Sequence, residues 1–338
     1  MLSMKKILVT IPEGDVRATF LPQRVRERLE AVFETDYNET GRQFTKEELR
    51  SLLPGYDAVL TGWGTPMLSE DVLSGSRRLK LIVHTGGTVG NLVDSFAYDR
   101  GITVFSGNQL YAESVAEGTL AYMLLAQRRL PDYLGRVREG HWRTEADVWE
   151  GLLGKTVGIV GIGTISTILI RMLQVFGVTI KVFSSHDIPE ELISRYGVQP
   201  ASLEEIFSTC DIVSLHSALN SRTRGGIRKA HFRLLKDNAL LVNTARGDVL
   251  DEEALIEELQ TGRIRAVLDV YHQEPLPANS PLRSLPNVYA IPHMGGPTLD
   301  RRPHITEALI RDAERFFRGE TDFPLEITRA SASRMTKM

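Results

Sequence analysis

The sequence predicts an α/β fold with two doubly wound domains. The chain has 338 residues, which is more than one hydrophobic core usually supports. Short apolar runs alternate with segments of helical periodicity, and one long apolar stretch, residues 108–130, separates two such blocks. The short runs are apolar throughout, as in strands of a parallel sheet that helices cover on both faces.

The first block contains strands and helices in alternation. The expected strands are the runs at 6–11, 56–63, 79–87 and 102–107. The expected helices, which have charged outer faces, cover 21–33 and 45–53.

Two longer helices are expected outside this block. Residues 108–130 lack proline and are apolar on most sides, which predicts a buried or interface-forming helix. Residues 301–320 predict a helix that folds back onto the first block and makes that domain discontinuous. The tail, residues 328–338, is small, polar and basic, and we expect it to be frayed.

The second block repeats the pattern of buried strands. They are expected at 156–163, 179–185, 211–217, 239–245, 265–270 and 288–293. We therefore expect one domain at 1–106 and 299–338 and the other at 107–298, with hinges near Gly107 and Pro297.

Composition argues against several classes of partner. The chain has 40 basic and 43 acidic residues without a long block of like charge, so we expect neither nucleic acid nor a membrane as partner. No apolar run approaches the roughly 20 residues of a membrane span. Cys210 is the only cysteine, which excludes an internal disulfide and favours a reducing compartment, the cytoplasm. No spacing of histidine, cysteine and acidic residues suggests a metal site.

The stretch "TVGIVGIGTIS" has the order strand, glycine turn, helix, which is typical of dinucleotide-binding sites. Gly161 permits the tight turn and Gly163 lets the backbone approach a pyrophosphate. The helix then offers free N–H groups from about Thr164 and Ile165. Ser166 stands where a third glycine is expected; it costs packing room but leaves the anion site. The alternative is a glycine turn that binds no ligand.

Ser184 ends the next expected strand, where an acidic residue would bond the ribose hydroxyls of NAD and repel the extra phosphate of NADP. Serine can bond either group and repels neither. The sequence therefore predicts NAD or NADP as cofactor without a firm choice between them.

Three later segments place reactive side chains directly after buried strands, where open α/β sheets bind ligands. They are "NTARGDVLDEEAL" with Arg246, "LDVYHQEPLP" with Asp269 and Glu274, and "NVYAIPHMGG" with His293. Each has an ordinary alternative: a surface ion pair for the arginine, a loop cap for the histidine, a solvated turn for the glutamate. Their joint occurrence after the glycine turn is the specific signal.

In these segments, in "GKTVGIVGIGTI" and in their order, the sequence resembles the D-2-hydroxyacid dehydrogenase family, from about Lys5 to Gly319. The resemblance implies a Rossmann cofactor domain inserted in a discontinuous flavodoxin-like substrate domain, and a homodimer that the helix from Asn108 supports. It also implies that Arg246, Glu274 and His293 are catalytic and that Asp269 orients the nicotinamide. Further cofactor contacts implied by it are Ser217, Ala218, Thr223, Thr244, Ala245 and Gly295.

The resemblance places the substrate carboxylate at the glycine loop "HTGGTVG", on Thr85, Gly86 and Gly87. Here the loop departs from the commoner family form, because an aspartate does not follow soon after the glycines. Its neighbour His84 has two possible roles, as a structural residue or as part of the pocket.

The chemistry of these residues fits hydride transfer to a 2-keto acid. His293 can give a proton to the carbonyl oxygen, and Glu274 beside it would favour the imidazolium form. The planar fork of Arg246 suits a carboxylate and a polarised carbonyl. The sequence therefore predicts an enzyme acting on a small 2-keto or D-2-hydroxy acid, without naming the acid or the physiological direction.

Two other functions remain possible. One is a non-catalytic nucleotide-sensing module with the same fold. The other is a relative that oxidises a different small anion, such as formate or phosphite. The joint presence of Arg246, Glu274 and His293 argues against the first, because binding alone does not require all three.

Overall fold

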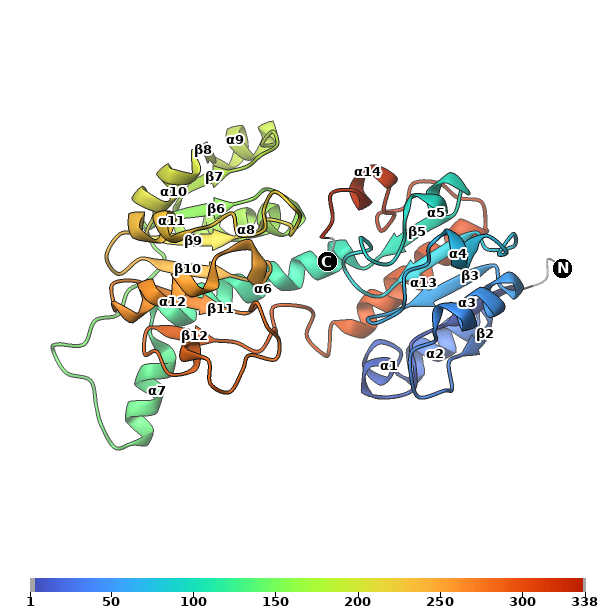
Figure 1. Ribbon diagram of the computed structural model, residues 1–338, viewed down its shortest axis with the longest axis horizontal. Coiled ribbons are helices and arrows are strands. Elements are labelled where there is room, and N and C mark those ends of the chain that lie inside the picture. Colours follow the sequence, from blue (N-terminus) through green and yellow to red (C-terminus); the bar gives the residue numbers. More distant parts are fainter. Residues whose placement is uncertain (1–3, 337–338) are drawn as a thin grey trace. The chain divides into compact units, whose positions relative to one another are not determined.

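The computed structural model describes residues 4–336, which form two compact units (Figure 1). Unit 1 comprises the described residues up to Tyr111 and those from Pro297 onward, and unit 2 comprises Ala112–Gly296. Each unit is built on one parallel sheet, so the predicted fold class is confirmed.

The sheet of unit 1 has the strand order β2-β1-β3-β4-β5, with every pair parallel. This is the order of flavodoxin-like sheets. The strands are β1 Lys5–Val9, β2 Phe33–Tyr37, β3 Ala58–Thr61, β4 Leu81–His84 and β5 Thr103–Ser106.

Helices cover both faces of this sheet. One face packs against α1 Asp15–Phe20, α2 Gln23–Glu30 and α13 Arg302–Phe317. The other packs against α3 Lys46–Leu52, with η1 Leu53–Gly55, α4 Glu70–Leu73 and α5 Ser95–Asp99. Ile305, Leu309 and Ile310 of α13 share a core with Val9 and Leu60, so the expected return of the chain onto the first block is confirmed (Figure 1).

Strand β2 was not predicted from the sequence, because the preceding helix was expected to continue to residue 33. The helix ends at Glu30, and Phe33 begins an edge strand that pairs only with β1. Its sequence, FETDY, buries Phe33 fully and leaves its charged residues exposed. A half-solvated edge strand lacks the continuous apolar run by which the other strands were recognised.

The prediction of a frayed tail is wrong for residues 328–336. They include a short helix, α14 Arg329–Ala332, whose N-cap Thr328 accepts a hydrogen bond from the Ser331 N–H. Ile327 and Ala332 are buried in the core of unit 1, and Met335 packs against it. These apolar side chains were hidden among small polar neighbours. Residues 337 and 338 lie outside the described residues.

The sheet of unit 2 is also parallel, in the order β12-β11-β10-β9-β6-β7-β8. Its strands are β6 Thr156–Val160, β7 Thr179–Phe183, β8 Gln199–Pro200, β9 Ile212–Leu215, β10 Leu240–Asn243, β11 Arg265–Leu268 and β12 Val288–Ala290. Six of these were predicted; the two-residue β8 was not. The order reverses between β6 and β9, as in Rossmann folds, and ligands bind at such a reversal.

Helices pack on both faces of the second sheet as well. One face carries α6 Asn108–Gln127, α8 Thr164–Leu173 and α9 Glu190–Tyr196, and the other carries α10 Leu203–Thr209, α11 Lys229–Leu234 and α12 Glu252–Gln260. The remaining elements are α7 Leu130–Arg138, η2 Gln174–Phe176, η3 Gly247–Val249 and η4 Pro281–Arg283.

The long apolar helix ends three residues earlier than expected. Ala116, Met123 and Ala126 of α6 are buried in the core of unit 2, which accounts for its apolar sequence. Arg129 has a left-handed φ of 49°, and this conformation separates α6 from α7. None of the described helices has the length and apolarity that a membrane crossing requires.

Candidate active site

The predicted site residues of unit 2 follow the carboxyl ends of strands that lie side by side. Because the sheet is parallel, these ends share one edge. Across that edge the order is His293 after β12, Asp269 after β11, Arg246 after β10, Ser217 after β9, Gly161 after β6 and Ser184 after β7. Residues distant in the sequence are thus brought into one row.

The glycine turn has the form that a pyrophosphate requires. Gly161 has a φ of +100°, and a Cβ atom there would lie 2.8 Å from the Ser217 nitrogen, so only glycine fits. A Cβ on Gly163 would meet no atom within 4 Å, which leaves open space before the helix. Thr164 and Ile165 form the first turn of α8, where amide groups have no acceptor within the helix. These features fit a dinucleotide phosphate.

Ser166, at the position of the absent third glycine, is fully buried. Its hydroxyl accepts the Gly163 N–H at 2.8 Å and donates to the Gly163 carbonyl at 3.1 Å. The serine therefore holds the turn onto the helix, and the space that it needs is present.

Ser184 is half-buried at the end of β7, next to β6. Its hydroxyl oxygen accepts the His186 N–H at 3.0 Å, so it stabilises the turn that follows the strand. The two residues after it, Ser185 and His186, are exposed.

Hydroxyl groups of the loop after β9 form hydrogen bonds with backbone groups and so stabilise the loop. Thr223 donates to the Ala218 carbonyl at 2.6 Å and accepts the Asn220 N–H at 2.9 Å. Ser217 donates to the Val160 carbonyl at 3.3 Å. His216 shares a 2.9 Å hydrogen bond with Ser214, and desolvation lowers its pKa to about 4, so the ring is neutral.

The turn after β10 depends on Asn243, a residue that was not predicted from the sequence. Asn243 is fully buried; its side-chain oxygen accepts the Ala245 N–H and its amide donates to the Arg246 carbonyl, both at 3.1 Å. The Thr244 hydroxyl is bonded to that of Thr119 at 3.0 Å. The sequence does contain a signal for this role, because Asn243 is a polar residue at the end of an otherwise apolar strand.

Arg246 is half-buried, with its Nη1 donating to the Ala245 carbonyl at 2.6 Å. Its Nε is buried and has no hydrogen-bond partner among the described residues. Burial lowers the pKa of Arg246, and the nearby Glu274 carboxylate opposes that shift. A Cβ on Gly247 would lie 2.0 Å from the Tyr271 carbonyl carbon, so only glycine lets the arginine turn approach the segment that carries Glu274.

His293 and Glu274 form the predicted pair. His293 Nδ1 lies 2.5 Å from Glu274 Oε2, and the other carboxylate oxygen accepts the Tyr271 N–H at 3.0 Å. The histidine side chain is 49% exposed and its backbone has a left-handed φ of 51°. Nε2 has no partner within the described part of the chain, so it is the ring nitrogen that can exchange a proton with a ligand.

Asp269 is buried and fixes the segment that follows His293. Its Oδ1 accepts the Met294 N–H at 2.7 Å and its Oδ2 accepts the Gly295 N–H at 2.9 Å. These bonds hold the chain directly after the left-handed histidine. The expected contact of Asp269 with nicotinamide stays a prediction.

The glycine loop of unit 1 follows β4. Thr85 is buried and its hydroxyl donates to the Thr61 carbonyl at 3.1 Å, so its side chain supports the loop from behind. The Ser106 hydroxyl lies 2.9 Å from the Gly86 carbonyl and 2.6 Å from that of Gly87. With both carbonyls turned to Ser106, the N–H groups of the two glycines are the polar groups left for a ligand.

His84, at the end of β4, is a buried neutral residue. It shares a 2.9 Å hydrogen bond with the Thr61 hydroxyl, and burial lowers its pKa to about 4. The structural role is the one that this geometry supports.

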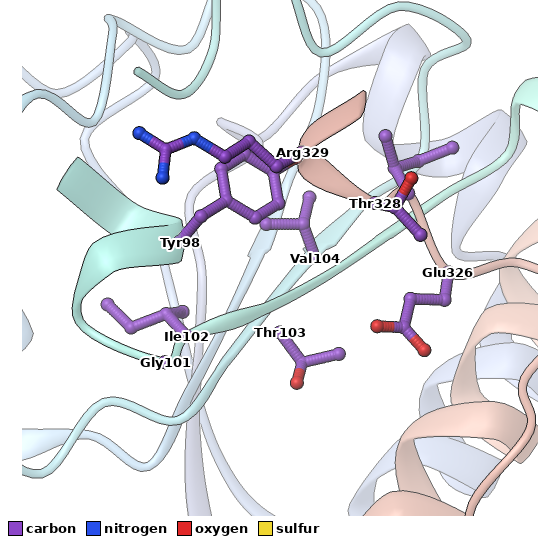
Figure 2. A pocket seen from close by; sticks show the side chains of 9 residues that line it. Tyr98, Gly101, Ile102, Thr103, Val104, Glu326, Thr328 and Arg329 are labelled. Atoms are coloured by element: carbon purple, nitrogen blue, oxygen red, sulfur yellow. The ribbon is translucent and has the colours of Figure 1, made fainter. Parts of the chain in front are cut away.

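Figure 2 shows a pocket of about 270 Å³ elsewhere on unit 1, at the amino end of β5. Arg329, on its rim, is already paired with Asp99 at 2.7 Å. The pocket contains none of the predicted site residues; it is lined by Tyr98, Gly101, Ile102, Thr103, Val104, Glu326, Ile327, Thr328 and Arg329. Within residues 4–336, no group of three or more His, Cys, Asp or Glu side chains is placed to hold a metal ion.

The strand order of unit 2 and its glycine turn define a dinucleotide-binding α/β protein. Residues 120–295 match the family described as "D-isomer specific 2-hydroxyacid dehydrogenase, NAD binding domain". The chain belongs to this family, and unit 2 contains its NAD-binding domain.

Individual relatives are similar over most of the chain. The D-3-phosphoglycerate dehydrogenase of Methanocaldococcus jannaschii is 33% identical over 319 residues, which cover 94% of this chain and 58% of that protein. The hydroxypyruvate reductase of Thermotoga maritima is 32% identical over 275 residues, 80% of this chain and 88% of that protein. A crystal structure of a glyoxylate reductase from Paecilomyes thermophila superimposes with a TM-score of 0.80 at 25% identity, covering 97% of this chain and 100% of the other.

The chain spans only about half of several of these relatives. Its match covers 58% of the M. jannaschii protein and 52% of the D-3-phosphoglycerate dehydrogenase of Archaeoglobus fulgidus.

Proposed function

We propose that the chain is an NAD(P)-dependent oxidoreductase that interconverts a small 2-keto acid and the corresponding D-2-hydroxy acid. Membership of the family supports this reaction class. The observation that carries the proposal is the His293–Glu274 pair, with Nδ1 bound to the carboxylate and Nε2 available to a ligand. A protein that only senses a nucleotide does not require such an acid–base pair.

In the reductive direction, His293 gives the proton on Nε2 to the carbonyl oxygen of the substrate. Glu274, at Nδ1, fixes the ring orientation and stabilises the imidazolium before the transfer. In the oxidative direction, Nε2 takes the proton from the hydroxyl group. The two directions use the same ring nitrogen, since the other is held by Glu274.

Arg246 would bind the substrate carboxylate and polarise the carbonyl. Its partnerless Nε and its single protein acceptor leave donors for this purpose. The N–H groups of Gly86 and Gly87 would also bind the carboxylate, on the substrate domain. We propose the following domain boundaries: the substrate domain comprises residues 1–106 and 299–338, and the cofactor domain comprises residues 107–298.

The dinucleotide would be held at Gly161, Gly163 and the first turn of α8, where open space precedes free amide groups. When bound in its reduced form, it supplies the hydride that adds to the carbonyl carbon. Ser184 would face the adenosine ribose. As serine carries no charge to repel a phosphate, we propose that both NAD and NADP are accepted. One solved protein of this fold, an acyclic imino acid reductase, is in complex with NADPH and D-Arg.

We further propose a homodimer in the cytoplasm. The single cysteine supports a reducing compartment. Among residues 4–336, fourteen large apolar side chains are exposed, and seven of them lie between Leu130 and Leu153; Trp142 is 76% exposed. Figure 1 shows α7 and the segment after it protruding from unit 2. An apolar surface of this kind is typical of a subunit interface, and analytical ultracentrifugation of the full chain tests it.

A screen of small 2-keto acids with NADH and NADPH tests the proposed reaction. We expect loss of the absorbance of the reduced cofactor with at least one keto acid, and none with formate or phosphite plus oxidised cofactor. Cofactor binding without turnover of any keto acid would favour the nucleotide-sensing alternative instead.

A further inference from the structure

Four side chains of unit 1 form an aromatic–arginine cluster, which consists of Phe20, Trp63, Tyr111 and Arg302. The Trp63 ring meets Phe20 edge-on at 5.1 Å and Tyr111 edge-on at 6.3 Å between centroids. The Arg302 guanidinium lies 5.1 Å from the Trp63 ring centre and 5.4 Å from that of Phe20. The chain thus brings a cation and three aromatic rings together.

Arg302 is held in place but its charge is not neutralised by the protein. Its Nη1 donates to the Thr19 hydroxyl at 3.0 Å, and its Nε is buried without a partner. Within residues 4–336, no carboxylate lies at ion-pair distance from it. Neighbouring arginines differ: Arg24 pairs with Glu307, and Arg28 and Arg318 both pair with Glu314.

The half-buried position makes this arrangement costly without a ligand. Contact with the aromatic faces stabilises the cation but supplies no hydrogen-bond acceptor. The buried Nε therefore keeps the cost of a donor without a partner. An anion bound to the guanidinium would supply both the missing charge and the missing acceptors.

The cluster lies at the carboxyl edge of the sheet of unit 1. Trp63 follows β3 by two residues, and a Cβ on Gly87, after β4, would lie 3.4 Å from the Tyr111 ring. The Trp63 ring contacts both the Arg302 guanidinium and the Tyr111 ring. The side chains of Tyr111 and Trp63 therefore connect the cation to the proposed carboxylate loop.

We propose that the aromatic–arginine cluster is a second anion subsite, which selects 2-keto acids that carry a further carboxylate or phosphate beyond the carbonyl carbon. Arg302 is its specificity-determining residue, because its planar fork binds two oxygens of such a group. Trp63 and Phe20 hold the fork and exclude water from one side of it. This inference rests on the proposed function, since it assigns the substrate class of that same site.

Matched substrates test the subsite kinetically. 2-Oxoglutarate and 2-oxopentanoate differ in the terminal carboxylate, and phosphohydroxypyruvate and hydroxypyruvate differ in the phosphate. The wild-type chain should have the higher kcat/KM for the dianion in at least one pair. Arg302→Met should lower kcat/KM for that dianion about tenfold or more while changing the uncharged-tail partner less than about threefold.

Arg311→Met is the matched control. Arg311 is exposed on the same helix, α13, and the substitution removes the same charge. It should leave the ratio of the two kcat/KM values unchanged. Arg302→Lys, which keeps the charge without the fork, should give an intermediate ratio. Equal losses on both members of a pair in Arg302→Met, or a wild-type preference for the monoanions, would overturn the inference.

Direct binding separates this inference from the proposed reaction. Calorimetric titration of the cofactor-loaded chain with glutarate, which cannot react, should give a Kd at least about tenfold weaker in Arg302→Met than in Arg311→Met. If no keto acid is turned over, the proposed function fails, and this titration alone decides the subsite. Equal glutarate affinities in the two variants would refute it, and thermal melting of both checks that they fold.

Discussion

The Arg246 guanidinium illustrates how one residue combines burial with unused hydrogen-bonding capacity. The side chain is half-buried, its Nε is buried without an acceptor in the described structure, and its Nη1 donates only to the Ala245 carbonyl. A buried donor without a partner costs about 1–3 kcal/mol, which a bound carboxylate would offset. The position after a buried strand was visible in the sequence; the unsatisfied nitrogen was not.

Arg246→Lys tests this use of the guanidinium. Lysine keeps the charge but cannot make two parallel hydrogen bonds, so kcat/KM on the best keto acid should fall about tenfold or more, or roughly 1.4 kcal/mol of transition-state stabilisation. Steady-state kinetics measure the effect, with Arg311→Lys as an exposed control. Unchanged kinetics would exclude the assigned role.

Glu274→Gln tests the pairing with His293. The amide carries no charge and cannot hold the His293 ring at Nδ1 as the carboxylate does, so kcat/KM for reduction of the best keto acid should fall about tenfold or more. Steady-state kinetics of wild type and variant measure the effect. Unchanged kcat/KM would show that the pair does not act together in solution.

The buried His84 predicts a stability effect with a defined sign. Its pKa is about 4 in the folded chain, whereas an unfolded histidine titrates near about 6.5. Above the higher value the ring is neutral in both states and stability is complete. As the pH falls from about 6.5 to about 4, only the unfolded chain takes up the proton, so stability declines, by about 2 kcal/mol at about pH 5.

Thermal melting at about pH 7 and about pH 5 measures this decline. His84→Gln, which cannot be protonated, should lose less stability than the wild type between the two conditions. An exposed histidine on the same unit, His304, provides the control variant His304→Gln. If His84→Gln and the wild type lose the same stability, the ring is not held neutral in the fold.

At the scale of elements, the turn between β6 and α8 keeps its form although the third glycine of the dinucleotide-binding motif is replaced. Ser166 fills the place of the third glycine and bonds both backbone groups of Gly163, so the phosphate-facing part of the turn keeps its form. The departure at Ser184 differs, because it changes the charge at the end of β7 and not the backbone.

Ser184→Asp restores that charge. In a partly solvated site the repulsion of a phosphate is on the order of a few kcal/mol, so NADPH affinity should fall at least about tenfold more than NADH affinity. Fluorescence titration of wild type and variant with both reduced cofactors measures the ratio, and Ser185→Asp, at the exposed neighbouring position, is the control. A ratio unaffected by Ser184→Asp would mean that the residue does not face the ribose. Failure of both cofactors to bind the wild type would contradict the dinucleotide site.

The sequence predicts those strands and helices that consist of continuous or periodic apolar residues, and it does not predict those with few apolar residues. The strands before Thr85, Gly161, Arg246, Asp269 and His293 are continuous apolar runs, and parallel sheets place their ends together. The edge strand β2 and the tail around α14 have few apolar residues, so only tertiary packing reveals them. Ser106 and Arg302 act through contacts with distant segments, which a single sequence does not display.

At the scale of the whole molecule, the groups of the proposed site are divided between the two units. Unit 2 carries the glycine turn and the His293–Glu274 pair on one edge of its sheet. Unit 1 carries the glycine loop and the aromatic–arginine cluster on the carboxyl edge of its own sheet. In the proposed reaction the cofactor turn, Arg246 and the proton donor belong to unit 2, and the glycine loop of unit 1 adds N–H groups for the substrate carboxylate.

Transfer of isotope from cofactor to product is the most direct test of the proposed hydride transfer. The full chain is incubated with the keto acid that it reduces best and with reduced cofactor deuterated at the hydride-donating carbon, and the product is analysed by NMR. We predict deuterium at the second carbon of a D-2-hydroxy acid for the wild type, and almost none for His293→Ala, although this variant should bind the cofactor with nearly unchanged affinity. Absence of deuterium from the wild-type product, or equal transfer by His293→Ala, would contradict the proposed reaction.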